Sequence, residues 1–129
     1  MPFAQASGVE IVSAEPAGVT GRLAWASERC TVGGVLHGAA LMTLADSVGA
    51  VCAFLNLPPG ATTSTTTSST CFLAAVRGGV VTAFSRPLQV GRTVVVVRTE
   101  LFDADDRLVA HVVQTQSVRA APPAAASPG

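Results

Sequence analysis

The chain has 129 residues, of which 49% are hydrophobic and only 12% are charged. Its eight arginines balance eight acidic residues, and a formal net charge of zero argues against non-specific binding to nucleic acid or to an anionic membrane. The charged share is about half that of an ordinary soluble domain. Because a small monomer cannot easily cover so much apolar surface, we expect a large interface between copies of the chain.

The chain has the length of one domain, which we expect to span residues 1–119. Residues 120–129 are rich in Pro and Ala and are expected to be disordered.

The three cysteines lack paired spacing, which argues against a disulfide framework or a zinc site, and Cys52 and Cys71 are expected to be buried thiols. The first residues lack a basic segment followed by an apolar run, so we expect no signal peptide and a cytoplasmic protein.

Residues 8–25 predict two strands joined by a turn at residues 16–18, where Pro and Gly stand together. A connection containing glycines follows, and residues 37–57 then predict one helix that residues 56–60 bring to an end. Apolar side chains recur along that helix at the spacing of one face. They are Leu41, Leu44, Ala45, Val48, Val51, Cys52 and Leu55. Since the remaining surface is mostly Ala, Gly and Met, we expect the helix to be buried on most sides.

One charged residue, Asp46, stands in the middle of this apolar helix, and it is the only charged residue between Cys30 and Val76. The length and apolar character of the helix raise the alternative of a membrane span. Against that alternative, a central Asp costs about 2.5–3.5 kcal/mol on insertion scales, and the ends of the helix carry no basic or aromatic flank. We therefore expect a helix inside a protein core and no membrane partner.

Residues 61–76 begin with a run of Thr and Ser that is compatible either with a low-complexity linker or with a strand. Thr favours strands and the run leads into Cys71 and Phe72, so we predict a strand. Three further strand-like runs follow, and the last two are joined by an acidic turn at residues 103–106, which predicts an antiparallel hairpin. The order of two strands, one long helix and four strands predicts an α+β fold in which an antiparallel sheet wraps the helix.

The segment GGVLHGAALMTLADSVGA and the later run RPLQVGRTVVVVRTELFDADDRLVAHVVQT together resemble the hotdog-fold acyl-CoA thioesterases. The closest type is the PaaI-like group of the phenylacetate pathway, related to 4-hydroxybenzoyl-CoA thioesterase. The specific feature is His37-Gly38 followed by an acidic residue, Asp46, eight positions after the glycine. The resemblance spans residues 8–119 and implies a curved antiparallel sheet around a central helix, assembled as dimers or tetramers.

Hydrolysis of a thioester requires a donor that stabilises negative charge on the carbonyl oxygen and a group that activates water or attacks directly. The N–H of Gly38, at the start of the predicted helix, suits the first role, and the resemblance implies it as well. Asp46 suits the second role as base or nucleophile. The alternatives are that Gly38 only shapes the start of the helix and that Asp46 lies on an exposed or internally hydrogen-bonded face.

Gly38 and Asp46 are eight residues apart, which is roughly 12 Å along one helix at 1.5 Å per residue. A single Asp side chain cannot close that gap onto one carbonyl carbon. If both residues serve the same thioester, they must come from different subunits, and the site must lie at a two-fold interface.

Four further residues are candidates through the resemblance. A hydroxyl that orients water falls on Thr65 when residues are counted back from Phe72, and on Ser64 when they are counted forward from Asp46; strand register favours Thr65. Thr31 stands where some relatives have an Asn that binds near the site. His37 either bonds near the carbonyl or pins the loop before the helix.

Coenzyme A carries phosphate groups, and the candidate arginines for them are Arg77, Arg86 and Arg92. No nucleotide or metal motif is present, and no cofactor is expected, because coenzyme A is part of the substrate. The leading interpretation is therefore an acyl-CoA thioesterase. A non-catalytic acyl-CoA-binding module and, less directly, a hotdog dehydratase remain as alternatives. The acyl group stays open, with an apolar pocket expected beside small helix residues: Ala39, Ala40, Gly49 and Ala53.

Overall fold

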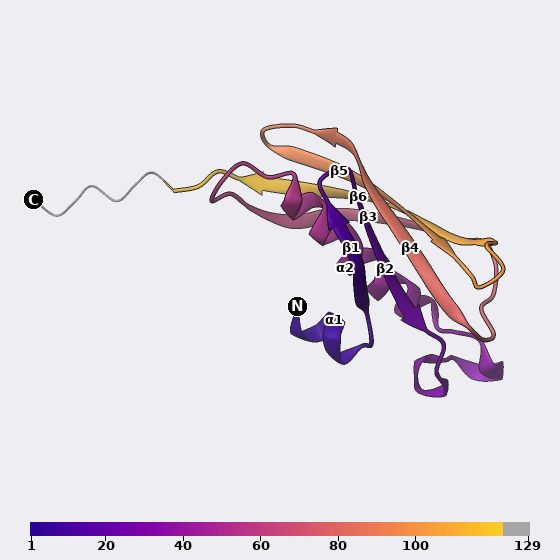
Figure 1. Cartoon of the computed structure of the whole chain (residues 1–129). Coiled ribbons are helices and arrows are strands. Elements are labelled where there is room, and N and C mark those ends of the chain that lie inside the picture. The colour runs from indigo at the N-terminus through magenta and orange to yellow at the C-terminus, as the bar shows by residue number, and fades with distance from the viewer. Residues whose placement is uncertain (123–129) are drawn as a thin grey trace, which may run out of the picture.

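A computed structural model describes residues 1–122 and consists of one curved antiparallel sheet with a long helix against its concave side (Figure 1). The helices are α1 (Pro2–Ala6) and α2 (Gly38–Leu55), with two short 3-10 turns between β2 and α2. The six strands follow in the order of the chain. They are β1 (Glu10–Glu15), β2 (Gly18–Ala24), β3 (Thr62–Phe72), β4 (Val80–Val90), β5 (Val94–Phe102) and β6 (Leu108–Arg119).

The strand order in the sheet is β1-β2-β4-β5-β6-β3, and every neighbouring pair is antiparallel. The predicted succession of two strands, a helix and four strands is confirmed, including the β5–β6 hairpin. The Thr-rich run forms β3, so it is a strand and not a linker. The short helix α1 was not predicted. The predicted disorder of residues 120–129 concerns a segment that lies largely outside the described residues.

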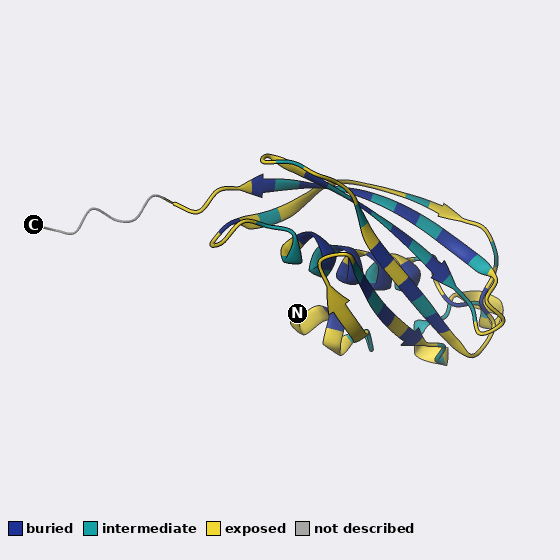
Figure 2. Ribbon diagram, turned by 45° about the horizontal axis from the view of Figure 1, so that its top comes forward, coloured by how far each residue is buried: buried dark blue, intermediate teal, exposed yellow. Residues whose placement is uncertain are grey.

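The core lies between the inner face of the sheet and one face of α2 (Figure 2). Strand β5, and β6 from Ala110 onward, alternate strictly, so every second side chain points at the helix and is buried. On the helix, Leu44, Val48 and Cys52 are fully buried, and burial of a Leu or Val side chain contributes about 1.5–3 kcal/mol to folding.

The expectation that α2 is buried on most sides is wrong for the single chain. A sheet that curves over a helix covers one side of it, and the other side carries exposed Met42, Asp46 and Phe54. The helix is long and apolar enough to cross a membrane by length and composition alone. Its buried face, however, packs against the sheet as the core helix of a folded domain does.

The position of Cys71 also differs from the prediction. Cys52 is buried as expected, and this burial raises the pKa of its thiol to about 11. Cys71 is exposed, because β3 lies at the edge of the sheet and Cys71 pairs with His111 on the face that points away from α2. Periodicity alone did not identify β3 as an edge strand.

Candidate active site

The start of α2 is organised by His37. Its ring Nδ1 accepts a hydrogen bond from the N–H of Ala39 at 3.0 Å, so the imidazole caps the helix as a polar side chain does at this position. The backbone N–H of His37 donates to the backbone carbonyl of Arg29 at 2.9 Å. Of the two predicted roles, the structure shows His37 holding the loop and the helix start, while its Nε2 is not engaged by any described residue.

The N–H of Gly38 has no hydrogen-bond partner within residues 1–122. It is the first residue of α2, where backbone donors point out of the helix and its dipole favours negative charge. A side chain at position 38 would be tight, because a Cβ there would lie 3.1 Å from Cζ of Phe72. Thr31, Gly38 and Phe72 line one cavity of about 410 Å³, so the structure brings Thr31 to the helix start.

A second cavity, of about 430 Å³, lies on the other side of the same helix start. It is lined by His37, Ala39, Ala40 and Thr43 together with residues of the preceding loop. The expectation that small helix residues border a pocket therefore holds for Ala39 and Ala40. It does not hold for Ala53, which is buried in the core, or for Gly49, whose Cα faces the side chain of Gln114.

Asp46 lies on the exposed side of α2, and its Oδ1 accepts a hydrogen bond from Nε2 of Gln114 at 2.8 Å. Gln114 is on β6 and is fully buried. Its Oε1 has no partner among the described residues, and leaving such an acceptor unpaired costs about 1–3 kcal/mol. Within one protomer, the structure therefore agrees with the alternative in which Asp46 lies on an exposed, internally hydrogen-bonded face.

Thr65 and Ser64 are separated by the register of β3 on β6. Thr65 pairs with the inward-facing Gln116, whose Nε2 donates to the Thr65 hydroxyl at 2.7 Å, whereas Ser64 pairs with Ser117 and points to the opposite face. Thr65 therefore lies on the side of the sheet that carries α2. A bulge at Thr66 follows, and it shifts the register for the rest of the strand.

Sequence reasoning missed Gln114 and Gln116. The signal was present: both occupy inward positions of a strand whose other inward residues are apolar. Those residues are Ala110, Val112 and Val118. Polar side chains buried at alternate positions of a core strand call for specific partners. Here one glutamine holds the candidate carboxylate, and the other holds the candidate hydroxyl.

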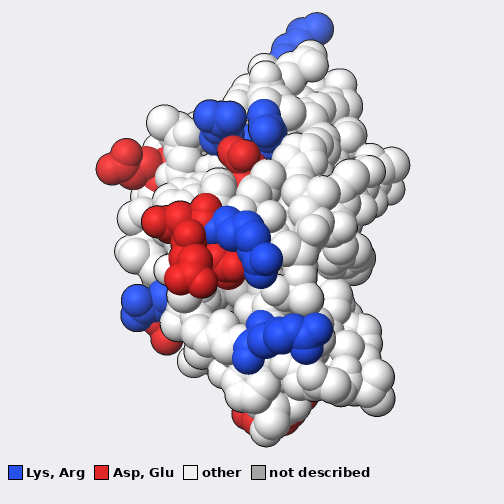
Figure 3. Space-filling model, turned by 90° about the vertical axis from the view of Figure 1, so that its right-hand side faces the viewer, with Lys and Arg blue, Asp and Glu red and all other residues white. Residues whose placement is uncertain are grey.

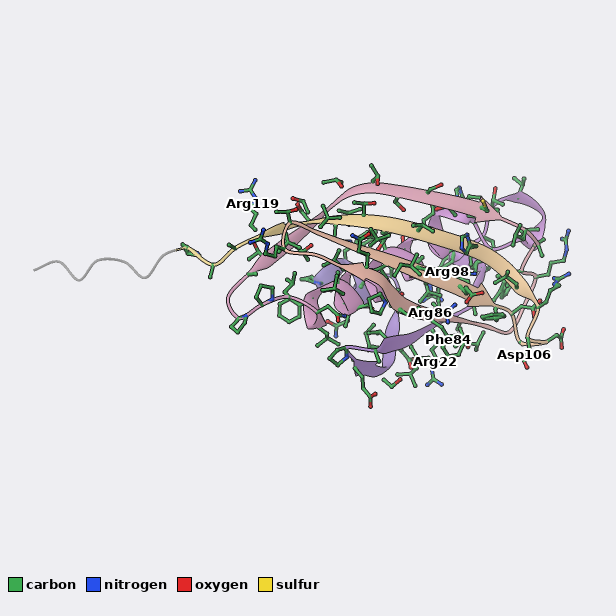
Figure 4. All side chains as sticks on the ribbon, turned by 90° about the horizontal axis from the view of Figure 1, so that it is seen from above. Arg22, Phe84, Arg86, Arg98, Asp106 and Arg119 are labelled. Atoms are coloured by element: carbon green, nitrogen blue, oxygen red, sulfur yellow. The ribbon has the colours of Figure 1, made fainter. Side chains whose placement is uncertain are left out.

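The three candidate arginines lie in different places. Arg77 lies beside the loop that leads into α2, because the carbonyl of the preceding residue, Val76, accepts a hydrogen bond from the N–H of Leu36. The Arg77 guanidinium donates to the carbonyl of Gly33 in the same loop, at 3.4 Å. Arg86 is on the outer face of the sheet, opposite Arg98, and is paired with Glu100 at 3.8 Å (Figure 4). Arg92 is exposed in the β4–β5 turn. Of these three arginines, Arg77 is the one that lies beside the loop before Gly38 within one protomer.

Charged side chains gather in small mixed groups on the face shown in Figure 3, and much of the remaining surface there is uncharged. No group of three or more His, Cys, Asp or Glu that could hold a metal ion occurs in the described part of the chain. Gly38 and Asp46 are both on α2, and the structure does not bring them together within one chain. Within one protomer, the candidate donor and the candidate carboxylate therefore lie apart on one helix.

Comparison with known proteins shows the family of this chain. A family model described as the thioesterase superfamily matches residues 33–110. A search among curated protein sequences found no match. A thioesterase from Haemophilus influenzae is 26% identical, with a TM-score of 0.86 and coverage of 91% of this chain and 82% of that one.

Two more distant structures share the fold. A variant of a thioesterase from Pseudomonas aeruginosa is 24% identical, with a TM-score of 0.85 and coverage of 90% and 84% of the two chains. A variant of the phenylacetic acid degradation protein PaaI from Thermus thermophilus is 21% identical, with a TM-score of 0.83 and coverage of 91% and 98%. Since the family match spans more than half of the chain and the sheet and helix agree with these structures, the chain belongs to the thioesterase superfamily and has the hotdog fold.

Proposed function

We propose that the protein hydrolyses an acyl-CoA thioester to a free carboxylic acid and coenzyme A. Membership of the thioesterase superfamily supports thioester hydrolysis as the reaction class. The observation that carries the proposal is the unpaired N–H of Gly38, which opens an apolar helix that bears Asp46 as its one carboxylate. The protein needs no further cofactor for this reaction, because coenzyme A is part of the substrate.

In this mechanism the thioester carbonyl oxygen accepts a hydrogen bond from the N–H of Gly38. The donor is fixed before the reaction and stabilises the charge that grows on the oxygen as the carbonyl carbon becomes tetrahedral. In one route, Asp46 of a second protomer takes a proton from water as the new C–O bond forms; the C–S bond of the tetrahedral intermediate then breaks, and Asp46 returns the proton to the leaving thiolate. In the other route, Asp46 attacks the carbonyl carbon and the C–S bond breaks, which releases the thiolate and leaves an anhydride. Water then opens the anhydride to the free acid, and a proton from this water goes to the thiolate. Thr65 orients the water.

The second protomer is a homo-oligomeric partner, in a dimer or a tetramer. Strand β3 supports this assembly: it is an edge strand whose residues are nearly all exposed, and it contains none of the charges or prolines that keep edge strands apart. Exposed apolar side chains lie close to the same region, on α2 (Met42, Phe54) and at the end of β3 (Phe72). A neighbouring chain that pairs with β3 also covers Asp46.

Arg77 is the arginine that we assign to the phosphate groups of coenzyme A, since it lies beside the loop that leads to Gly38. Its guanidinium is exposed and makes a single long hydrogen bond, so it is open to a ligand. Arg86 and Arg92 can contribute only if the partner protomer brings them to the same opening.

The test is to incubate the protein with a panel of short-chain, long-chain and aromatic acyl-CoA esters and to measure released thiol. We expect release from at least one ester. In the Asp46→Asn variant we expect kcat to fall by about 10²–10⁴-fold, with the fold and substrate binding retained, because an amide cannot accept the proton. Full activity of Asp46→Asn contradicts the assignment. Binding of acyl-CoA without any thiol release supports the alternative of a non-catalytic acyl-CoA-binding module.

A further inference from the structure

We propose that Gln114 is a positioning residue for the reaction. Its buried amide holds Oδ1 of Asp46 and so leaves Oδ2 as the oxygen that takes the proton from water or attacks the carbonyl. This inference rests on the proposed function, since it assigns a role to Gln114 through Asp46. Gln114 itself is fully buried, so the role assigned to it is exerted through Asp46.

The orientation of the amide follows from its two neighbours. An ionised carboxylate has only acceptors, so the Gln114 group that faces Oδ1 of Asp46 at 2.8 Å must be the NH₂ group. The opposite end, Oε1, then points at the backbone of α2. It lies so close to Gly49 that a Cβ at position 49 would collide with it. The bare Cα of Gly49 therefore makes room for the amide between helix and sheet.

Packing alone does not explain a glutamine at this position. Oε1 is buried and has no partner within residues 1–122, which destabilises the folded state. An apolar side chain of similar length would fill the same space without that cost. Ala110, Val112 and Val118 hold other inward positions of β6, whereas the two polar residues there, Gln114 and Gln116, each bond a candidate site residue. A residue that breaks the local packing rule next to the one carboxylate of the helix indicates a functional constraint.

The burial of Gln114 allows its hydrogen bond to fix the orientation of the Asp46 carboxylate. Asp46 is on the exposed side of α2, where a free carboxylate samples several rotamers, whereas Gln114 is locked by its surroundings. A charge-assisted hydrogen bond from a fixed donor holds one carboxylate oxygen and orients the other. The sheet thus pre-sets the direction of Oδ2 before substrate or a partner protomer arrives.

The test uses Gln114→Met, which keeps the length and removes both polar atoms. We expect kcat to fall by about tenfold or more with little change in KM, because the lost hydrogen bond to a charged group acts on the chemical step. We expect an unchanged or higher melting temperature, since the unpaired acceptor is gone. The matched control is Val112→Ala on the same face of β6, which should lower the melting temperature and leave kcat unchanged.

A double-mutant cycle separates a positioning role from a merely structural one. If Gln114 acts through Asp46, adding Gln114→Met to Asp46→Asn causes no further loss of kcat, whereas independent effects multiply. A wild-type kcat for Gln114→Met, or the same loss in both backgrounds, overturns the inference. Full activity of Asp46→Asn instead overturns the proposed function, so the two failures are distinguishable.

Gly49→Ala is the second variant, for use if Gln114→Met does not fold. This substitution disturbs the Gln114 amide from the side of the helix, because the added methyl group must displace Oε1 of Gln114. We expect a folded protein with a lower kcat. A folded Gly49→Ala with wild-type kcat counts against the inference.

Discussion

His37 caps α2 with its own ring nitrogen, and this leaves the N–H of the next residue open at the start of the helix. Gly38 occupies the first helical position, where proline is well tolerated because the N–H there makes no intrahelical bond. His37 already has φ −61° and ψ 138°, a conformation that is compatible with a following proline.

We predict that Gly38→Pro lowers kcat by about 10²–10³-fold, because it removes the donor of the oxyanion site while the helix still begins at the same residue. Gly38→Ala is the matched control. It adds the same Cβ beside Phe72, which is half-exposed and free to move, but it keeps the N–H. Steady-state kinetics gives kcat for both variants, and circular dichroism checks that the helix is intact in each. Equal losses in the two variants would assign the effect to crowding at Phe72.

At the scale of elements, α2 is held on one side only, and the β5–β6 hairpin is closed by a polar turn. Asp103 organises that turn: its Oδ1 accepts from the N–H groups of Asp105 and Arg107, both at 2.9 Å, and its Oδ2 is 3.1 Å from the Arg107 guanidinium. The hydrogen bond from the backbone N–H of Arg107, followed by the other contacts, lowers the pKa of the Asp103 carboxyl below its ordinary value of 3.8.

A carboxyl group whose pKa is lower in the folded than in the unfolded chain stabilises the fold at pH values above its unfolded-state pKa. This stabilisation is lost as the pH falls through the pKa of the folded state. We therefore predict that Asp103→Asn lowers the melting temperature by a few degrees at neutral pH, and that the gap to wild type narrows below about pH 4. Thermal unfolding of both proteins, from neutral pH to below about pH 4, measures the difference in melting temperature. Asp105→Asn, an exposed residue of the same turn, is the control; an identical profile for it would contradict the assignment.

For the whole molecule, the proposed reaction needs Gly38 and Asp46 from different protomers, because the two residues lie apart on one helix. In the two-fold assembly that we propose through the β3 edge, the helix start of each protomer meets the carboxylate of the other, with two equivalent sites per dimer. The exposed apolar side chains around α2 and the low charge of the chain agree with a covered surface in this region.

Complementation tests the shared site. Gly38→Pro and Asp46→Asn chains carrying different tags are co-expressed, and the heterodimer is purified through both tags. Each homodimer is expected to be inactive. In the heterodimer, one of the two sites combines an intact Gly38 with an intact Asp46, so we expect about half of the wild-type activity per dimer. If each site came from a single chain, both sites would stay defective, and the heterodimer would be as inactive as its parents.

The sequence by itself determined the order of the elements, the apolar face of α2 and the location of Gly38 and Asp46 on that one helix, because these depend on local periodicity and spacing. The Thr-rich strand followed from the strand preference of Thr, although its place at the sheet edge, and hence the exposure of Cys71, did not.

Only the tertiary structure decided which hydroxyl faces the helix and which amides hold the site. The choice between Thr65 and Ser64 depends on a cross-strand register, and the contact between Gln114 and Asp46 joins residues 68 positions apart. Such contacts arise when distant strands and helices meet, and no local pattern encodes them. For the same reason, the side of α2 that one sheet leaves exposed became visible only in the folded chain.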